Sequence, residues 1–420
     1  MNVLTNPLKP KNERIATVLA FALIPMSGFA TDIYIPSLPT MAHSLGVSEL
    51  AVQLTLGMFL ISYGVSQLFV GSLLDSFGRY RINLISLFVF ALASIIIANT
   101  VNIYLIYAMR IVHGITVGAI VVSKRAYFID VYSGDRLKNY LSMFSIIWAT
   151  APIVAPFVGG YLQTFFGWQA NFYFLAAFAL FILVLEIIFS GETINQRMVF
   201  SLKKIVSVYV NMIGTTSFTL AIIMLGLSYS MIMVYNMTGP FIIEHELGLS
   251  PIIAGYSSLV LGGAVMLGGL FGKVTINSPF IKKLSINVAL QFGFCLAMFG
   301  SLFFVANLYS IIFFAFCIHA TSGYTFNIFF TFCLSRFPKN AGIASGLTGG
   351  INYIIVSFLS YGIITAIPAK DALNLVYSYA VLIGLSFLVI IIIFKQYSKH
   401  TSNYRLNKEK ATNSNSSRLF

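Results

Sequence analysis

The chain alternates between long apolar stretches and short polar segments. An α-helix rises about 1.5 Å per residue, so about 20 apolar residues are needed to cross a bilayer. Windows of this length predict twelve spanning helices, which begin near Ile15, Val52, Ile82, Ile103, Tyr140, Asn171, Val208, Ile252, Ile286, Tyr309, Gly342 and Leu373. The pattern therefore predicts an all-α integral membrane protein with twelve transmembrane helices.

The composition supports this class. Of the 420 residues, 58% are hydrophobic and 9% are charged, whereas about a quarter of the residues of a soluble protein are charged. The first apolar run, which starts at Ile15, is longer than the roughly 7 to 15 apolar residues of a cleavable signal peptide, and no small-residue cleavage site follows it. We therefore expect this segment to remain as a spanning helix.

Basic residues collect on one side of the predicted membrane. If the N-terminus lies inside, the inner loops and the two tails hold all but two of the 25 Lys and Arg residues. The exceptions are Arg110, within a predicted helix, and Lys370, in an outer loop. Short cytoplasmic loops carry an excess of these residues, so both termini are expected in the cytoplasm.

The longest inner loop before the tail divides the predicted helices into two sets of six. The expected regions are a cytoplasmic tail at 1–14, a first bundle at 15–190, an inter-bundle loop at 191–207, a second bundle at 208–395 and a cytoplasmic tail at 396–420. The last tail is polar, so we expect it to be disordered. Its basic residues are expected to contact anionic membrane lipid.

The loop after the second predicted helix reads GSLLDSFGRYR from Gly71 to Arg81. The glycines Gly71 and Gly78 permit a tight turn and close helix packing. Asp75 and Arg79 can pair with each other or face the end of a neighbouring helix, because a carboxylate is favoured near a helix N-terminus. An ordinary charged turn is the alternative interpretation.

The predicted fifth helix contains two prolines and a glycine pair, Pro152, Pro156, Gly159 and Gly160. Proline in a spanning helix frees backbone carbonyls and bends the helix. Adjacent glycines let another helix approach closely. We expect these four residues to serve conformational change, and a merely kinked helix is the alternative.

These two segments resemble signatures of the major facilitator superfamily. The loop resembles the pattern G-x-L-x-D-R-x-G-R-R, with departures at Ser76 and Tyr80, and the helix resembles the antiporter motif that is associated with exporters. Several further stretches are similar, in order and spacing, to the bicyclomycin and chloramphenicol resistance group of drug:proton antiporters. They include DIYIP from Asp32, YSGDR from Tyr132, GPF from Gly239 and AGIASG from Ala341.

The resemblance implies two pseudo-symmetric six-helix bundles that rock around a central site and alternate its access. It implies export of small lipophilic or cationic compounds across a bacterial inner membrane in exchange for protons. It also implies that Asp75 acts as a latch against the start of the eleventh helix, near Asn340 to Gly342. We expect this transporter to act as a monomer.

A carboxylate stands inside the first apolar segment. An ionised Asp at a bilayer centre costs about 2.5 to 3.5 kcal/mol on insertion scales, so Asp32 needs a functional reason. The resemblance places it with Arg110 of the fourth helix on the central cavity. Our hypothesis is that Asp32 exchanges a proton for substrate while Arg110 tunes its ionisation. The alternative is a static ion pair that joins the first and fourth helices.

Several neighbours are secondary candidates. His113 follows Arg110 by three residues, on nearly the same helix face, and is either a second proton site or a neutral hydrogen-bond donor. Pro36 and Pro39 are expected to end or bend the first helix. Substrate contacts are expected among aromatic and amide residues on cavity-facing helices, namely Tyr34, Tyr63, Trp148, Tyr235 and Asn236.

Two further groups of polar residues lie near predicted helix ends. Glu186, near the inner end of the sixth helix, is expected to reach the membrane interface by snorkelling. Glu244, His245 and Glu246 are expected to be solvated in an outer loop.

Other classes of protein find little support. The phosphate-binding pattern G-x-x-x-x-G-K-[ST] is absent from the sequence, which argues against an ATP-driven pump. The three cysteines lack metal-site spacing, and we expect no metal, cofactor, nucleic acid partner or enzymatic activity. A dedicated exporter of one metabolite, such as a siderophore or a peptide, is the main alternative. A nutrient importer on the same scaffold is less favoured.

Overall fold

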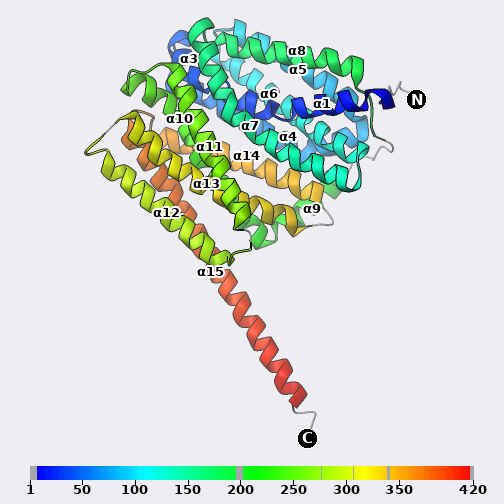
Figure 1. Cartoon of the computed structure of the whole chain (residues 1–420), viewed down its shortest axis with the longest axis vertical. Coiled ribbons are helices and arrows are strands. Elements are labelled where there is room, and N and C mark those ends of the chain that lie inside the picture. The colour runs from blue at the N-terminus through cyan, green and yellow to red at the C-terminus, as the bar shows by residue number, and fades with distance from the viewer. Residues whose placement is uncertain (1–6, 195–201, 276, 306, 338–340, 417–420) are drawn as a thin grey trace.

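Long helices make up nearly the whole of the computed structural model (Figure 1), which describes residues 7–194, 202–275, 277–305, 307–337 and 341–416. Within these ranges, eleven helices are long and apolar enough to cross a membrane. A further helix, α7 (Gly134–Phe166), has 33 residues and lies where the fifth span was predicted. The hydropathy pattern therefore located a helix at each predicted span.

The first half of the chain contains six spans, of which the first is built from several pieces. These pieces are η1 (Pro10–Asn12), α1 (Glu13–Leu23), α2 (Met26–Asp32), η2 (Ile35–Ser37) and α3 (Leu38–Leu45). The other spans are α4 (Glu49–Phe77), α5 (Arg79–Asn99), α6 (Ile103–Val131), α7 and α8 (Gln169–Phe189).

The second half begins with a short helix, α9 (Leu202–Ile213), that precedes its spans. The spans are α10 (Thr216–Phe241), which continues into the π-helical turn η3 (Ile242–Glu246), followed by α11 (Pro251–Val274), α12 (Phe280–Ser301), α13 (Leu308–Arg336), α14 (Ala341–Ala366) and α15 (Ala372–Ser416).

The helices form two bundles. In the first, α6 packs against α4 and α5, and α5 packs against α8; in the second, α13 packs against α10, α11 and α12. The bundles meet where α4 packs along α14 and α7 packs along α11. In Figure 1, α5 and α8 lie at one edge of the molecule and α12 and α15 at the other, with these four interface helices between them.

Glycine makes the close approach between the bundles possible. A Cβ atom on Gly64 of α4 would lie 2.6 Å from the carbonyl oxygen of Gly350 of α14. A Cβ on Gly160 of α7 would lie 2.7 Å from the carbonyl oxygen of Pro251, at the start of α11. Small residues allow backbones to touch in this way, so both interface pairs depend on them.

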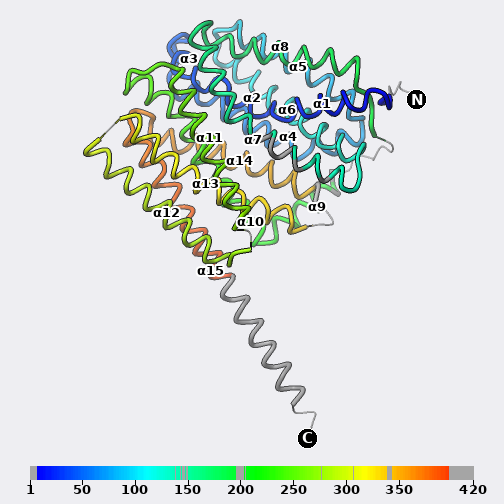
Figure 2. Tube along the Cα trace, in the orientation of Figure 1, coloured from blue at the N-terminus to red at the C-terminus, as the bar shows by residue number. Residues whose placement is uncertain are grey.

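The first span is bent at the two prolines. Its helix breaks after Asp32, and Pro36 lies in the 3₁₀ turn η2, while Pro39 stands in the first turn of α3. Figure 2 traces α1, α2 and α3 as successive pieces of one span. Because α3 continues to Leu45, the prolines bend the span but do not end it.

Two boundaries differ from the predicted ones. The seventh span begins at Thr216 rather than near Val208, because Leu202–Ile213 forms the separate helix α9. The last helix runs as far as Ser416, although disorder was predicted from residue 396, and its part that is apolar enough to cross a membrane ends at Gln396.

Candidate functional site

Asp32 lies at the C-terminal end of α2, where the first span breaks, and is 1% exposed. Its Oδ1 atom lies 3.5 Å from Nδ2 of Asn236 in α10. Within the described ranges, no Lys, Arg or His nitrogen lies within 4.0 Å of its carboxylate. The carboxyl group is thus enclosed between the bundles without a direct cationic partner.

Arg110 is fully buried in α6, but its donors are directed to backbone carbonyls. Its Nη1 atom donates to the carbonyl oxygen of Ala30 at 2.8 Å, and its Nε atom donates to that of Thr55 at 3.3 Å. The guanidinium also lies 4.7 Å from the ring centre of Tyr34 and 4.5 Å from that of Phe59, within cation–π range. The predicted alternative, a direct ion pair with Asp32, is not formed in this structure.

The hydrogen bonds of His113 define its protonation state. Its Nδ1 atom lies 3.3 Å from Nη1 of Arg110, and its Nε2 atom lies 3.0 Å from Oγ of Ser94. A guanidinium only donates hydrogen bonds, so Nδ1 accepts and Nε2 donates to the serine. This arrangement requires a neutral imidazole, which agrees with the second of the two predicted roles.

The residues expected to contact substrate fall into different environments. Tyr34 is buried and bonds Thr55 through its hydroxyl group at 2.8 Å, so it packs within the first bundle. Tyr235 is buried against His319, with ring centres 5.6 Å apart. Asn236 contacts Asp32, as described above. Trp148 belongs to α7, and its side chain lies outside the described residues.

Tyr63 faces the second bundle through an aromatic contact that the sequence did not reveal. Its ring centre lies 4.7 Å from that of Tyr353 in α14, and Tyr229 of α10 lies 5.9 Å from Tyr353 on the other side. Tyr63 was among the expected cavity residues, but Tyr229 and Tyr353 are ordinary members of an aromatic-rich sequence, so composition gave no signal for them. Only the pairing of α4 with α14 places them together.

The glycines of α7 pack this helix against both bundles. A Cβ atom on Gly159 would lie 1.6 Å from the carbonyl oxygen of Ile33, at the break of the first span. Gly160 contacts the start of α11, as described above. Pro152 and Pro156 lie inside an unbroken helix. The predicted close approach at the glycine pair is therefore present, on one side against the segment that carries Asp32.

At the inner end of the first bundle, Arg79 pairs with two carboxylates, those of Asp75 at 2.8 Å and of Asp130. Gly78 has φ of 99°, a backbone conformation that favours glycine, and so permits the turn between α4 and α5. No atom lies within 4 Å of a Cβ built on Gly71, so the predicted packing role of Gly71 is wrong. The predicted latch of Asp75 lies against the start of the eleventh helix near Asn340 to Gly342, where Asn340 is outside the described residues, so the latch stays a prediction.

A second ion pair lies deeper in this region. Lys124 Nζ lies 2.7 Å from both carboxylate oxygens of Glu186, and Asn83 donates to the same carboxylate at 3.2 Å. Because Glu186 is fully buried, the prediction that it reaches the interface by snorkelling is wrong. Lys124 itself lies in α6 rather than in a loop.

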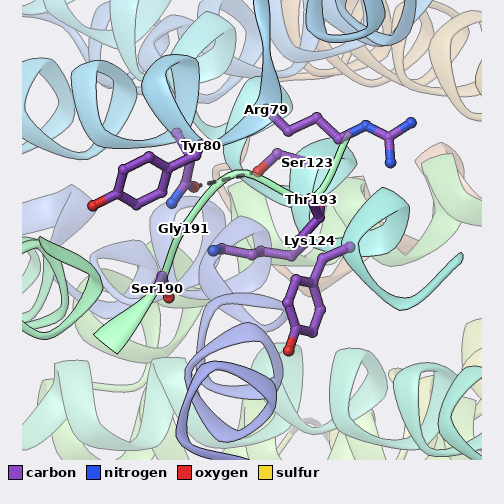
Figure 3. Close-up of a pocket in the computed structure, with 9 residues that line it drawn as sticks. Arg79, Tyr80, Ser123, Lys124, Ser190, Gly191 and Thr193 are labelled. Atoms are coloured by element: carbon purple, nitrogen blue, oxygen red, sulfur yellow. Dashed lines mark hydrogen bonds between the residues drawn. The ribbon is translucent and has the colours of Figure 1, made fainter. Parts of the chain in front are cut away.

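Figure 3 shows the cavity of about 20 Å³ beside this pair, lined among others by Arg79, Tyr80, Lys124 and Thr193. Glu192, in the segment after α8, accepts hydrogen bonds from the backbone N–H groups of Arg79 at 3.2 Å and Tyr80 at 3.3 Å. It therefore caps the N-terminus of α5, where a carboxylate is favoured.

The bundles contact each other at the outer end. His245 Nδ1 lies 3.1 Å from Oε1 of Glu49 in the opposite bundle, and Thr40 donates to Glu244 at 3.5 Å. Glu246 accepts from the backbone N–H of Ala372 at 2.9 Å. His245 and Glu246 are exposed, as expected, whereas Glu244 is half-buried, and all three lie in the turn η3 and not in a loop.

Contacts at the inner end complete the closure. Arg125 Nη1 donates to Ser345 Oγ of α14 at 2.8 Å. The hydroxyl group of Tyr209 in α9 donates to the carbonyl oxygen of Leu68 at 2.8 Å. Burial raises the pKa of Tyr209 to about 12, so this phenol keeps its donor proton at neutral pH. Contacts between the bundles are therefore present at both ends, and Asp32 is buried between them.

Comparison with known proteins identifies the family. The profile of the Major Facilitator Superfamily matches residues 20–361. The chain belongs to the major facilitator superfamily. It is 28% identical over 357 residues to the Uncharacterized MFS-type transporter YdgK of Bacillus subtilis (strain 168), a match that covers 83% of this chain and 88% of that protein.

Two relatives carry names related to drug resistance. Multidrug resistance protein D of Escherichia coli (strain K12) is 26% identical over 333 residues, which cover 79% of this chain and 84% of that protein. The Bicyclomycin resistance protein homolog of Haemophilus influenzae is 36% identical over 165 residues, which cover 39% of this chain and 42% of that protein. The resemblance predicted from the motifs is thereby confirmed.

Solved structures share the fold of this superfamily member. The D-xylose-proton symporter has a TM-score of 0.66 at 16% identity, and the match covers 90% of this chain and 97% of the symporter. A mutant of the nucleoside transporter NupG has a TM-score of 0.69 at 13% identity, and the match covers 91% of this chain and 99% of that transporter. Identities this low support the fold alone, and the predicted multi-pass membrane fold is confirmed.

Proposed function

We propose that this superfamily member is a secondary transporter that exports small lipophilic or cationic compounds in exchange for protons. The observation that carries the proposal is the enclosure of Asp32 between the bundles without a cation within 4.0 Å, among the described residues. An ionised carboxylate in such a place is costly. The closed arrangement therefore favours a carboxyl group neutralised by a proton or by a bound substrate.

Exchange of substrate for a proton follows if the bundles close only when the charge of Asp32 is neutralised. When the bundles open outward, a proton neutralises Asp32 and allows them to close; when they open inward, substrate displaces the proton and allows closure again. Arg110 favours release of the proton, since its charge remains close by while its donors bind Ala30 and Thr55. One proton that moves down the membrane potential supplies about 2.3 kcal/mol per 100 mV.

The names of the relatives support drug export as the direction and substrate class. A dedicated exporter of one metabolite is the runner-up, and a nutrient importer is less favoured. We place the protein in the bacterial inner membrane with both termini in the cytoplasm, because the basic residues collect at the inner loops and tails. A monomer completes the proposal, because one chain supplies both bundles.

Two measurements test this function. Growth of a strain that overproduces the protein on a panel of toxins should show increased resistance to several unrelated compounds. A metabolite profile of a deletion strain separates the runner-up, because accumulation of one compound inside the cells without any change in resistance would favour a dedicated exporter.

A further inference from the structure

The Asp32 carboxylate has one hydrogen-bond partner in the described part of the chain, and that partner belongs to the other bundle. Asp32 ends α2 of the first half, whereas Asn236, whose Nδ2 atom lies 3.5 Å from Asp32 Oδ1, is part of α10 in the second half. Opening the interface between the halves would break this contact. It is therefore a direct structural link between the group that we propose to exchange the proton and the relative position of the bundles.

The backbone of α10 is held at this level by the first bundle. Gln53 of α4 is 1% exposed, and its Nε2 atom donates to the carbonyl oxygen of Met237 at 2.7 Å. Proline has no N–H group, so Pro240 cannot donate to the carbonyl of Asn236 four residues earlier, and the helical ladder is interrupted here. The position of Asn236 is thus fixed by contacts between the halves as well as by its own helix.

An amide suits a carboxyl group whose charge changes. Its nitrogen donates to a carboxyl oxygen whether or not the carboxyl group is protonated, and its oxygen can also accept from the O–H of the protonated form. When the bundles close, water leaves the interface, and a carboxyl group without a protein partner would lose its hydrogen bonds. Asn236 supplies the missing partner in the closed state.

Among the described side chains, the other titratable or charged groups that face Asp32 are Arg110 from α6, Tyr34 from its own span, Tyr229 from α10 and Tyr353 from α14. An arginine stays charged and a tyrosine stays neutral across the neutral pH range. A change of pH in that range therefore acts on this site through Asp32.

We propose that Asn236 is a positioning residue for proton exchange. It forms a hydrogen bond with the neutral carboxyl group of Asp32 and so permits the bundles to close when the proton binds. This rests on the role of Asp32 under the proposed function. It replaces the expectation that Asn236 contacts substrate, and it predicts that acid-dependent closure needs Asn236 even when no substrate is present.

The test measures bundle closure without substrate. The full-length protein, with its three cysteines replaced by alanine, carries spin labels at exposed positions on the two halves, one pair at the outer end (His43 and Ser250) and one at the inner end (Arg81 and Lys282). The parent protein for this test also carries His245→Gln, which removes the imidazole that contacts Glu49 at the outer end.

The distances between the spin labels are measured in phosphatidylethanolamine and phosphatidylglycerol nanodiscs at about pH 5.5 and about pH 8.5. Desolvation can shift the titration of a buried carboxyl group into this range. Short distances at both ends report the closed state.

In the parent protein, the closed population should rise at the lower pH. Asn236→Ala should reduce the closed-to-open ratio at that pH about tenfold, as expected when a buried group loses its hydrogen-bond partner. If the alanine variant does not fold, Asn236→Leu, which keeps a side chain of similar length, should show the same loss. Asn287→Ala is the matched control, because it removes a buried amide that bonds Thr325 within the second bundle, and it should keep the response.

The outcomes separate this proposal from the proposed function. If Asn236→Ala and Asn236→Leu respond to acid as the parent does, the role of Asn236 is overturned. Loss of the response in Asp32→Asn in the same experiment would still leave the role of Asp32 intact. An acid response that persists in Asp32→Asn, or that is absent from the parent, would overturn the role of Asp32 and with it the role of Asn236.

Discussion

Arg110 binds two backbone carbonyls and one imidazole. These contacts affect the charge states of its neighbours His113 and Asp32. Because His113 accepts from the guanidinium, it is neutral in the closed state and links Arg110 to Ser94. Because the guanidinium lies beside Asp32 without bonding it, the carboxyl group can change charge without breaking the contacts of Arg110.

Glutamine should replace His113 with little loss. Its amide can accept from Arg110 through oxygen and donate to Ser94 through nitrogen, so His113→Gln should change the rate of proton-driven export by less than about fivefold, the size of one neutral hydrogen bond. His113→Leu, which keeps the volume but not the hydrogen bonds, should lower the melting temperature of the purified protein. A loss of pH dependence in His113→Gln would instead show that the imidazole carries a proton in the cycle.

A methyl group on Gly159 should disturb the site from a distance. Its Cβ would lie 1.6 Å from the carbonyl oxygen of Ile33, so Gly159→Ala should destabilise the protein by about 1 to 3 kcal/mol, as overpacking does. Thermal unfolding in detergent measures this change. Gly71→Ala in α4 is the matched control, because no atom lies within 4 Å of its Cβ, and it should be neutral or slightly stabilising. Equal effects of the two substitutions would contradict this packing.

At the scale of elements, the π-helical turn η3 extends α10 and brings His245 to Glu49 of the first bundle. Such an extension is not visible in the hydropathy pattern, which placed these residues in a solvated loop. The contact joins the halves on the outer face, which is the side from which protons enter in the proposed exchange.

This outer contact lies between exposed side chains, so it should add only modestly to closure. His245→Gln should weaken outer closure by up to about fivefold, the size of a strong exposed ion pair. Spin-label distances across the outer end measure this change, and a much larger loss of closure would show that His245 joins the halves through more than its contact with Glu49.

At the scale of the whole molecule, the spans could be predicted because a helix in lipid must satisfy its own backbone groups and expose apolar side chains. The position of Asp32 in the first span followed from the same pattern. The partner of Asp32 did not, because Asn236 comes from the other half of the chain, and its proximity depends on how α10 packs against the first bundle. The prediction for Glu186 assumed that its charge reaches the membrane interface. In the structure, the buried Lys124 pairs with this charge inside the bundle.

Under the proposed function, protonation of Asp32 drives transport through the closing and opening of the bundles. Uptake of one compound from the resistance panel into inverted membrane vesicles with an imposed pH gradient measures this coupling. The parent protein should accumulate the compound in response to the gradient, and Asp32→Asn should exchange it without responding. Accumulation by Asp32→Asn that still follows the pH gradient would show that Asp32 is not the group that exchanges the proton.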